Sequence, residues 1–562
     1  MRNQPFTAMI AARHLTQVHA KQLRQFGAAF FGQRLLREDF GGDLFHLGDA
    51  AFGVIQFHTK LGLRALHRFG AAGFHHSSEA IGTEAQIPRD QGEDHKQQET
   101  NSNTHAPDDS MGFPMRRRDF LLSLAAPARR RPNILFLFTD DQRADSIGAL
   151  GNPHAITPNL DKLVRSGFVF RNAYCLGANM GAVCTPSRNM LLSGRAYFRW
   201  QGPLAPAEAA NFPVSMKELG YQTYHHGKRG NTAVAIQAKF ETSKYLQDEP
   251  SRTSGEPGKE IADEAIQFLS SRDQTKPFFL YLAFSGPHDP RVAAKQYMDK
   301  FERARIPLPK NFLPLHPFDN GEQTVRDELL AGFPRTEDEV RGHLHDYYAV
   351  MNALDGHIGR LLDHLKATGQ YENTIIVFSS DHGLAMGSHG LMGKQSLYED
   401  AMKPPLIFSG PGIKPGSSEA LVYLLDIFPT VVELADGAPP PGLDGKSLKP
   451  ILDRRSAKVR DTLFCSYRDV QRMVRDQRWK LIRYPKINRT QMFDLGRDPH
   501  ELRDLSAAPA QQKRIERMTA ELRRWQGDLG DKAPLESASP APAEFKPPSP
   551  EEYAAMRKKL KM

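Results

Sequence analysis

Residues 181–190 read GAVCTPSRNM and place Cys184 directly before a Thr-Pro-Ser-Arg run. Pro186 suits the first turn of a helix, and RNMLLSG extends the helical pattern to Gly194, so we expect Cys184 at or just before a helix N-terminus. The free N–H groups and the helix dipole at such a position favour an anion. The same field lowers the pKa of a thiol, so both a nucleophilic cysteine and a chemically modified cysteine fit the pattern.

Acidic residues follow two apolar runs elsewhere in the chain. NILFLFTDD ends in Asp140 and Asp141, and TIIVFSSDHG carries Asp381 and His382. An Asp-Asp pair taken alone is usually a solvated turn, but carboxylates gathered at the top of one sheet repel unless a cation neutralises them. Their oxygens favour a hard divalent ion, calcium or magnesium. An imidazole is less typical of calcium, so the identity of the metal stays open.

The elements that must position these residues alternate between strand and helix from Pro132 onward. Predicted strands cover 133–141, 221–227, 277–286 and 374–383, and predicted helices cover 157–167, 215–220, 260–272 and 345–369. This alternation predicts an α/β fold with a large, mostly parallel (mixed) central sheet flanked by helices. Ligands of such sheets bind beyond the carboxyl ends of the strands. Three of the predicted strands end in residues that could bind a metal or take part in catalysis, at Asp140-Asp141, Pro287-His288 and Asp381-His382.

The run from Cys184 to Arg188 resembles the Cys-x-Pro-x-Arg signature of type I sulfatases, which directs conversion of the cysteine to formylglycine. The resemblance covers about 132–505 and includes GYQTYHHGK, SGPHDP, DHGLAMGSHG, GKQSLYE, LDIFPTVVELA and MFDLGRDPHELRDL. This family belongs to the alkaline phosphatase superfamily and usually holds calcium. The resemblance implies hydrolysis of a sulfate monoester on a small molecule or carbohydrate. It also implies a formylglycine-generating or sulfatase-maturating enzyme as a partner.

Matching positions carry the metal site of this family. Asp140, Asp141, Asp381 and His382 match the metal ligands, and the formylglycine formed from Cys184 also touches the metal. Calcium is the implied ion, with magnesium as the alternative.

Basic residues match the positions around the sulfate. Arg188 corresponds to the arginine that holds the modified residue, and Lys228, His288 and Lys394 correspond to residues around the sulfate and the leaving oxygen. These residues imply a catalytic and substrate-binding set in which His288 or Lys394 protonates the departing alcohol. Asp141 is a candidate base for the attacking hydroxyl.

One position departs from the family pattern. Many relatives follow the Gly-Lys at 227–228 with a tryptophan and then a histidine that contacts the site, whereas this chain continues Arg-Gly-Asn. His225 and Asn231 are the candidates to replace that histidine. His389, in GSHG, either contacts substrate or caps a turn.

Three rival functions stay in view. The first is a phosphodiester or phosphonate monoester hydrolase of the same superfamily, and the second is a non-catalytic anion-binding protein with unmodified Cys184. The third, nucleic-acid binding, is disfavoured because the net charge is only +9 over 562 residues and basic and aromatic residues do not interleave.

A membrane span is disfavoured because no run of about eighteen apolar residues occurs. With three cysteines, a Cys175–Cys465 bridge is possible, but two small core residues are favoured.

The chain divides by composition into five segments. Residues 1–114 form an upstream extension, either disordered or a misassigned start, and 115–128 resemble a twin-arginine signal peptide. We expect the catalytic domain over 131–455, a subdomain with a small antiparallel sheet and a helix over 456–530, and a loosely held tail over 531–562. The signal predicts export to the periplasm or beyond, with the cytoplasm as the alternative. The proline-rich loop 300–335, which contains His316, is the expected place for substrate contacts.

Overall fold

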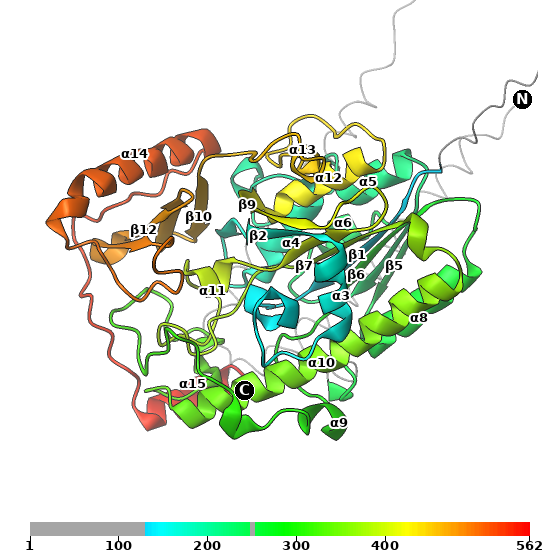
Figure 1. The fold of residues 1–562 in the computed structure, drawn as a ribbon. Helices are drawn as coiled ribbons and strands as arrows, with labels where there is room; N and C mark the ends of the chain where they lie inside the picture. The colour runs from blue at the N-terminus through cyan, green and yellow to red at the C-terminus, as the bar shows by residue number, and fades with distance from the viewer. Residues whose placement is uncertain (1–129, 248–252) are drawn as a thin grey trace, which may run out of the picture. The chain divides into compact units, whose positions relative to one another are not determined.

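The computed structural model describes residues 130–247 and 253–562, and the core of this part is an eight-stranded sheet (Figure 1). Its strands, in spatial order, are β5 (Thr242–Tyr245), β4 (Gln222–Gly227), β6 (Phe278–Ala283), β1 (Asn133–Thr139), β7 (Thr374–Ser380), β8 (Leu406–Ser409), β2 (Phe168–Tyr174) and β9 (Gly416–Tyr423). Only β8 runs antiparallel to its neighbours, β7 and β2, and the other pairs are parallel. The predicted mostly parallel, mixed sheet is therefore confirmed.

Strand β1 shows why the central strands are apolar throughout. Ile134, Phe136 and Phe138 point into the hydrophobic cluster on one face of the sheet, whereas Leu135 and Leu137 point into the cluster on the other face. Every residue of β1 is buried, as expected for a strand covered by helices on both faces. Successive side chains of β1 therefore alternate between two hydrophobic cores, and neither face of the strand is exposed to water.

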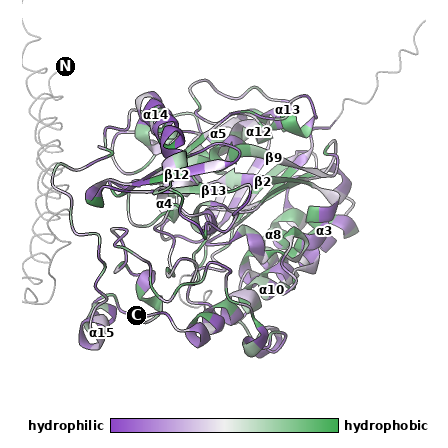
Figure 2. Cartoon of the chain, turned by 60° about the vertical axis from the view of Figure 1, so that its left-hand side comes forward, coloured by the Kyte–Doolittle hydropathy of each residue, from purple (hydrophilic) through white to green (hydrophobic). Residues whose placement is uncertain are grey.

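Two groups of helices supply these cores, and Figure 1 shows them above and below the sheet. The first face is covered by α4 (Cys184–Ser193), α5 (Phe212–Glu218), α6 (Val234–Gln237), α12 (Ile427–Leu434) and α13 (Lys449–Leu452). The second face is covered by α3 (Pro158–Ser166), α8 (Lys259–Ser271) and α10 (Glu337–Ala367), and α9 (Lys295–Met298) packs on α10. Helices α8 and α10 show both hydrophobic and hydrophilic colour in Figure 2, as helices with one buried side do.

The second sheet has five strands, four of which follow the central sheet in the chain. Its order is β13 (Arg489–Asp494), β12 (Trp479–Tyr484), β11 (Gln471–Arg475), β10 (Leu463–Tyr467) and β3 (Gly177–Ala178). The four C-terminal strands are antiparallel, as predicted, and α14 (Gln512–Leu529) accompanies them. The fifth strand, β3, was not predicted, and it pairs in parallel with β10. A Cβ at Gly177 would lie 1.9 Å from the Ser466 carbonyl oxygen, so only glycine allows this close pairing.

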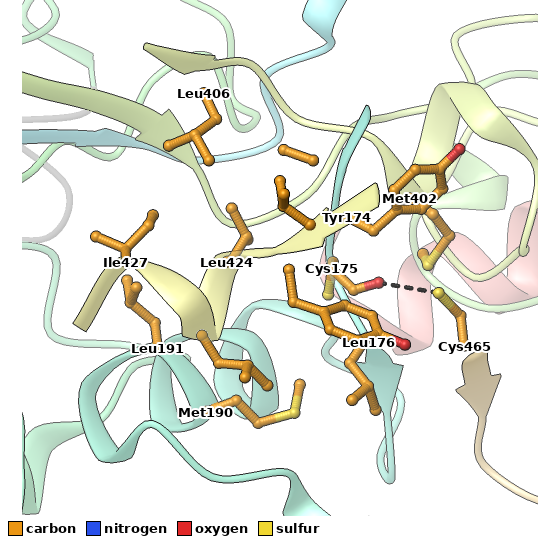
Figure 3. Packing of buried hydrophobic residues seen from close by; sticks show 14 of the residues in the cluster. Tyr174, Cys175, Leu176, Met190, Leu191, Met402, Leu406, Leu424, Ile427 and Cys465 are labelled. Carbon is orange, nitrogen blue, oxygen red and sulfur yellow. Dashed lines mark hydrogen bonds between the residues drawn. The ribbon is translucent and has the colours of Figure 1, made fainter. Parts of the chain in front are cut away.

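The join between the two sheets contains two of the three cysteines. Cys175 follows β2 and Cys465 lies in β10, and the Cys465 thiol donates to the Cys175 carbonyl at 3.2 Å (Figure 3). Leu176, Met402 and Leu424 surround them in the same buried cluster. All three cysteines of the chain are free and buried, so the interpretation of Cys175 and Cys465 as small core residues is confirmed.

The remaining elements are short or C-terminal. Helix α11 (Glu399–Met402) follows the loop after β7, and α15 (Pro550–Lys559) lies in the segment assigned to a loosely held tail. The Tyr553 hydroxyl of α15 donates to the Leu329 carbonyl at 3.1 Å. The 3₁₀ turns are η2 (Ala144–Ser146), η3 (Gly148–Leu150), η4 (Tyr197–Arg199), η5 (Arg303–Arg305), η6 (Glu328–Leu330), η7 (Tyr371–Asn373), η8 (Leu424–Asp426), η9 (Pro485–Ile487) and η10 (Pro509–Gln511).

The predicted extension 1–114 and the predicted signal 115–128 lie outside the described residues. Among the residues that are described, no helix is both long and apolar enough to cross a membrane.

Candidate active site

The acids of the site leave two neighbouring strands at the same edge of the sheet. Strands β1 and β7 pair in parallel with Thr139 opposite Ser380, so Asp140-Asp141 and Asp381-His382 follow at equal height. Asp141 has a φ of 63°, a left-handed turn that redirects the chain directly after Asp140. The Asp141 N–H donates to Oδ1 of Asp381 at 3.1 Å and ties the two strand ends together.

Cys184 is the first residue of α4 and lies against these acids. Its Sγ is 3.3 Å from Oδ1 of Asp140, 3.9 Å from Oδ1 of Asp141 and 3.2 Å from Nε2 of His382. One ligand atom from each of these residues and from Asp381 lies within 4.8 Å of all the others, and all five residues are buried. The sequence-predicted metal ligands are thus brought together around one point.

Arg188 follows Cys184 by one helical turn, so both side chains project from the same side of α4. Its Nε donates to Oδ2 of Asp381 at 3.0 Å, and its Nη2 donates to Oδ2 of Asp140 at 2.9 Å. The guanidinium is fully buried and lies 5.0 Å from the ring centre of Phe138. Arg188 therefore neutralises one carboxylate from each strand end while leaving their other oxygens directed to the common point.

Lys228, Lys394 and His288 complete the cluster from three further segments. Lys228 directly follows β4 and forms an ion pair with Asp140. Lys394 lies in the loop after β7, and its Nζ is 2.8 Å from Oδ1 of Asp141 and 3.3 Å from Sγ of Cys184. His288 follows β6, and its Nε2 is 3.8 Å from Oδ2 of Asp141. All the basic residues predicted for the site thus surround Cys184 and its acids.

Burial and charge act in opposite directions on these groups. Burial by itself would raise the pKa of Asp140, but the Lys228 and Arg188 cations hold that pKa well below its usual range. Burial by itself would lower the pKa of Lys394, but the Asp141 carboxylate holds it well above its ordinary value. For Cys184, burial and the Asp140 carboxylate raise the pKa of the thiol, against the lowering effect of Lys228 and Lys394.

The donor set fits a divalent cation. Three carboxylates supply hard oxygen ligands, and the imidazole of His382 is oriented by a hydrogen bond from Nδ1 to the Gly383 carbonyl at 2.9 Å. That bond leaves Nε2 with its lone pair directed at the cluster. Asp140, Asp141, Asp381 and His382 could therefore hold a metal together with the residue at position 184.

Four further residues were considered from the sequence. His225 is fully buried beside Tyr281, with ring centres 5.5 Å apart, and Asn231 is exposed. His389 stacks on Tyr398 with ring centres 3.8 Å apart. His316 is buried, with Nδ1 donating to the Phe318 carbonyl at 2.7 Å. His225 and His316 are therefore buried rings held by Ser243 and the Phe318 carbonyl, and Asn231 is open to solvent.

Four residues near the site were not found from the sequence. Asp327 lies 3.8 Å from Lys394, Asp289 lies 3.4 Å from His288, and Arg326 and Gln395 hold these acids. Asp289 and Gln395 each directly follow a predicted basic residue, which is the one sequence signal that pointed to them.

A family model described as Sulfatase matches residues 132–438, which is more than half of the chain. The chain belongs to the sulfatase family. It is a sulfuric ester hydrolase of the alkaline phosphatase superfamily, so the resemblance drawn from the sequence is confirmed. A second model, described as the C-terminal part of N-sulphoglucosamine sulphohydrolase, matches residues 387–528 of this sulfatase.

Curated and solved relatives of this sulfatase cover most of its described length. The N-acetylglucosamine-6-O-sulfatase of Bacteroides thetaiotaomicron is 27% identical over 512 residues, covering 74% of this chain and 90% of that protein. The structure of BT4656 in complex with its substrate D-glucosamine-2-N,6-O-disulfate matches with a TM-score of 0.63 and 24% identity, over 73% of this chain and 100% of that one. The phosphonate monoester hydrolase of Agrobacterium radiobacter matches with a TM-score of 0.61 and 21% identity, over 74% and 100%. At these identities the two structures show a shared fold.

Proposed function

We propose that this sulfatase hydrolyses a sulfate monoester to an alcohol and inorganic sulfate through a formylglycine made from Cys184 and a bound divalent metal. The observation that carries the proposal is the position of Cys184, at the start of α4 and 3.3 Å from Asp140. A thiol kept for structure gains nothing from a lysine, an arginine-held pair of acids and an imidazole around it. A residue that accepts a sulfuryl group needs all of them, because the sulfate oxygens must be neutralised before attack.

The metal is proposed as calcium, with magnesium as the alternative. Asp140, Asp141, Asp381 and His382 would hold it. When bound, it would offset the charge of the sulfate oxygens and lower the pKa of the hydroxyl at position 184. The imidazole is an unusual calcium ligand, so a metal titration is part of testing this function.

The modified residue 184 would supply a geminal diol, one hydroxyl of which attacks sulfur while the other later expels sulfate. Arg188 fixes the acids of both strand ends, and Lys228 places a second cation on Asp140. Asp141 is proposed to accept the proton of the attacking hydroxyl, because its Oδ1 is 3.9 Å from Sγ of Cys184. His288 or Lys394 would deliver a proton to the departing alcohol oxygen.

The proposed substrate is a sulfated carbohydrate, with a smaller sulfated alcohol as the alternative. A relative named N-acetylglucosamine-6-O-sulfatase and a fold neighbour bound to a disulfated glucosamine support a sugar. A formylglycine-generating or sulfatase-maturating enzyme is the proposed partner. We propose export by the twin-arginine route from residues 115–128; fusion of 115–131 to a reporter tests it, and retention of the fusion in the cytoplasm would count against it.

A desulfation screen tests the function. The protein is co-expressed with a maturation enzyme and given sulfated monosaccharides, sulfated polysaccharides and an aryl sulfate, with Cys184→Ala as the matched control. We expect sulfate release from at least one sugar by the wild type and none by the variant. Cleavage of an aryl phosphodiester or phosphonate, without sulfate release from any ester, would assign the site to the phosphoryl chemistry of the same superfamily instead.

A further inference from the structure

Three neighbouring pairs in the sequence meet beside the active site. They are His288-Asp289, Arg326-Asp327 and Lys394-Gln395, and each comes from a different loop. In the pairs that begin with His288 and Lys394, the first residue is a basic side chain that faces Cys184 or its acids. The second residue of each pair lies on the side away from the reacting centre. Asp289, Asp327 and Gln395 thus form a layer behind the bases, and Arg326 joins that layer together.

Behind Lys394 the acid is Asp327. Its Oδ2 accepts from Nε2 of Gln395 at 2.8 Å and lies 3.8 Å from Nζ of Lys394. The same ammonium lies only 2.8 Å from Asp141, on the side of the reacting centre. Lys394 is therefore shared between two carboxylates, and the closer one belongs to the site.

Behind His288 the acid is Asp289. The ring Nδ1 donates to the Asp289 carbonyl at 2.6 Å and lies 3.4 Å from its Oδ1, while Nε2 is directed at Asp141. Asp289 therefore contacts the side of the ring opposite the reacting centre. A movement of the Asp289 side chain or backbone would turn the imidazole.

Arg326 holds both acids at once. Its Nη1 donates to Oδ1 of Asp289 at 3.1 Å and to Oδ1 of Asp327 at 3.0 Å, and its Nη2 also bonds to Asp289. Both carboxylates are more than nine-tenths buried, whereas 40% of the Arg326 side chain is exposed. One guanidinium thus compensates two nearly buried charges that would otherwise repel each other.

We propose that Arg326 is a positioning residue that, through Asp327 and Asp289, keeps Lys394 and His288 directed at the leaving oxygen of the substrate. This inference rests on the proposed function. Without the guanidinium, Asp327 would keep only Gln395 and Lys394 as partners and would draw the Lys394 ammonium away from Asp141. Asp289 would lose its two bonds to Arg326, and the orientation of His288 beside it would be less firmly fixed. Arg326 itself does not touch the residue at position 184.

This role predicts a loss that depends on the leaving group. An alkyl alcohol is a poor leaving group and needs a proton or a cation at its oxygen as the bond to sulfur breaks, whereas a nitrophenolate leaves unaided. A misplaced Lys394 and His288 would therefore slow alkyl sulfates far more than 4-nitrophenyl sulfate. A fault in folding, metal binding or the residue at position 184 would slow both esters alike.

The test compares Arg326→Met with Arg468→Met in the full-length, matured protein. Arg468 is a matched control, because its side chain is 44% exposed, close to the exposure of Arg326. It pairs with Glu322, which is buried as Asp289 and Asp327 are. For Arg326→Met we expect kcat/KM to fall by about 100-fold or more on an alkyl or sugar sulfate and by less than about tenfold on 4-nitrophenyl sulfate. Arg468→Met should change the ratio of the two values little. An equal loss on both esters in Arg326→Met, or the same ratio change in Arg468→Met, would overturn the proposal.

Two provisions keep the outcome decisive. If Arg326→Met does not fold, Arg326→Lys retains the charge but not the two-acid geometry, and it should shift the ratio in the same direction by a smaller factor. If the wild type releases sulfate from neither ester, the proposed function fails. The comparison then uses aryl and alkyl phosphodiesters of the same alcohols, where a selective loss supports the role of Arg326 and a uniform loss overturns it.

Discussion

Oδ1 of Asp140 lies 3.3 Å from Sγ of Cys184, although 44 residues separate them in the chain. Asp140 directly follows the central strand β1, and Cys184 begins α4 on one face of the same sheet. The contact therefore joins the carboxyl end of a strand to the N-terminus of a helix. Ligands of α/β sheets bind beyond the carboxyl ends of strands, and a helix N-terminus favours an anion. It is the structural basis for treating Cys184 as a reacting residue rather than a core residue.

Arg188 should be essential to stability as well as to activity. It is fully buried between Asp140 and Asp381, so Arg188→Met leaves two buried carboxylates without their shared cation. We expect the free energy of unfolding to fall by about 3–5 kcal/mol, measured by urea denaturation of protein without added metal. The control is Arg199→Met, whose partner Asp444 lies in a partly exposed pair and should cost at most about 1 kcal/mol. Equal losses in the two variants would contradict the buried role of Arg188.

Metal removal should abolish activity and lower Tm. Asp140, Asp141 and Asp381 come together around one point, so a divalent cation that binds the folded protein but not the unfolded chain stabilises it. We expect chelation to remove sulfate release and calcium or magnesium to restore it. Asp381→Asn should lower the metal content measured by elemental analysis at least about tenfold, since it removes a direct ligand. Full activity in protein shown to contain no metal would rule out this arrangement.

Lys228 should act on kcat. Its ammonium pairs with Asp140 beside Cys184, where charge on the sulfate must be compensated. Lys228→Met should lower kcat by about 100- to 1000-fold, a loss of the size seen when one charge-stabilising donor is removed. Lys244→Met, in the adjacent strand β5, removes an exposed pair with Glu264 and should leave kcat near the wild-type value. Similar kcat values for the two variants would show that Lys228 has no part in the reaction.

His225 should give the free energy of unfolding a defined pH dependence. Burial lowers the pKa of His225 from 6.5 to about 3, so the folded chain keeps the ring neutral where the unfolded chain takes up a proton. Stability conferred by the neutral ring is complete above pH 6.5 and falls as the pH is lowered toward 3. In His225→Phe this slope should decrease by about 1.4 kcal/mol per pH unit at the acid end of the range and by little at the alkaline end, measured by urea denaturation between pH 7.5 and 5.

The same variant tests whether His225 takes part in the reaction. Because the ring packs beside Tyr281 and Phe240, sulfate release at pH 7.5 should be unchanged in His225→Phe. A large loss of kcat at that pH would instead give His225 the role of the histidine that this chain lacks after Lys228.

The strands and the principal site residues could be predicted because local signals coincided with the fold. Apolar runs such as 133–139 and 374–380 are buried on both faces, and parallel pairing necessarily brings their carboxyl ends together. Pro186 fixed the start of α4 close to Cys184. The resemblance supplied the roles of Lys228, His288 and Lys394, which are unremarkable as single residues.

The rest depended on contacts with no local signal. Strand β3 is two residues long, and only the close approach of Gly177 to Ser466 creates it. The left-handed turn at Asp141 cannot be inferred from an aspartate in a run of acids. Arg326 and Asp327 come from an irregular loop, and their meeting with Asp289 is set by tertiary packing rather than by sequence spacing.

The mass of the proteolytic fragment containing Cys184, taken from protein co-expressed with a maturation enzyme, tests the proposed reaction most directly. Conversion of the thiol to the aldehyde removes one sulfur and two hydrogens and adds one oxygen. We predict that this mass change is present and that the converted fraction rises in proportion to the sulfate released by the same preparation. A fully active preparation in which the fragment retains its unmodified thiol would contradict it.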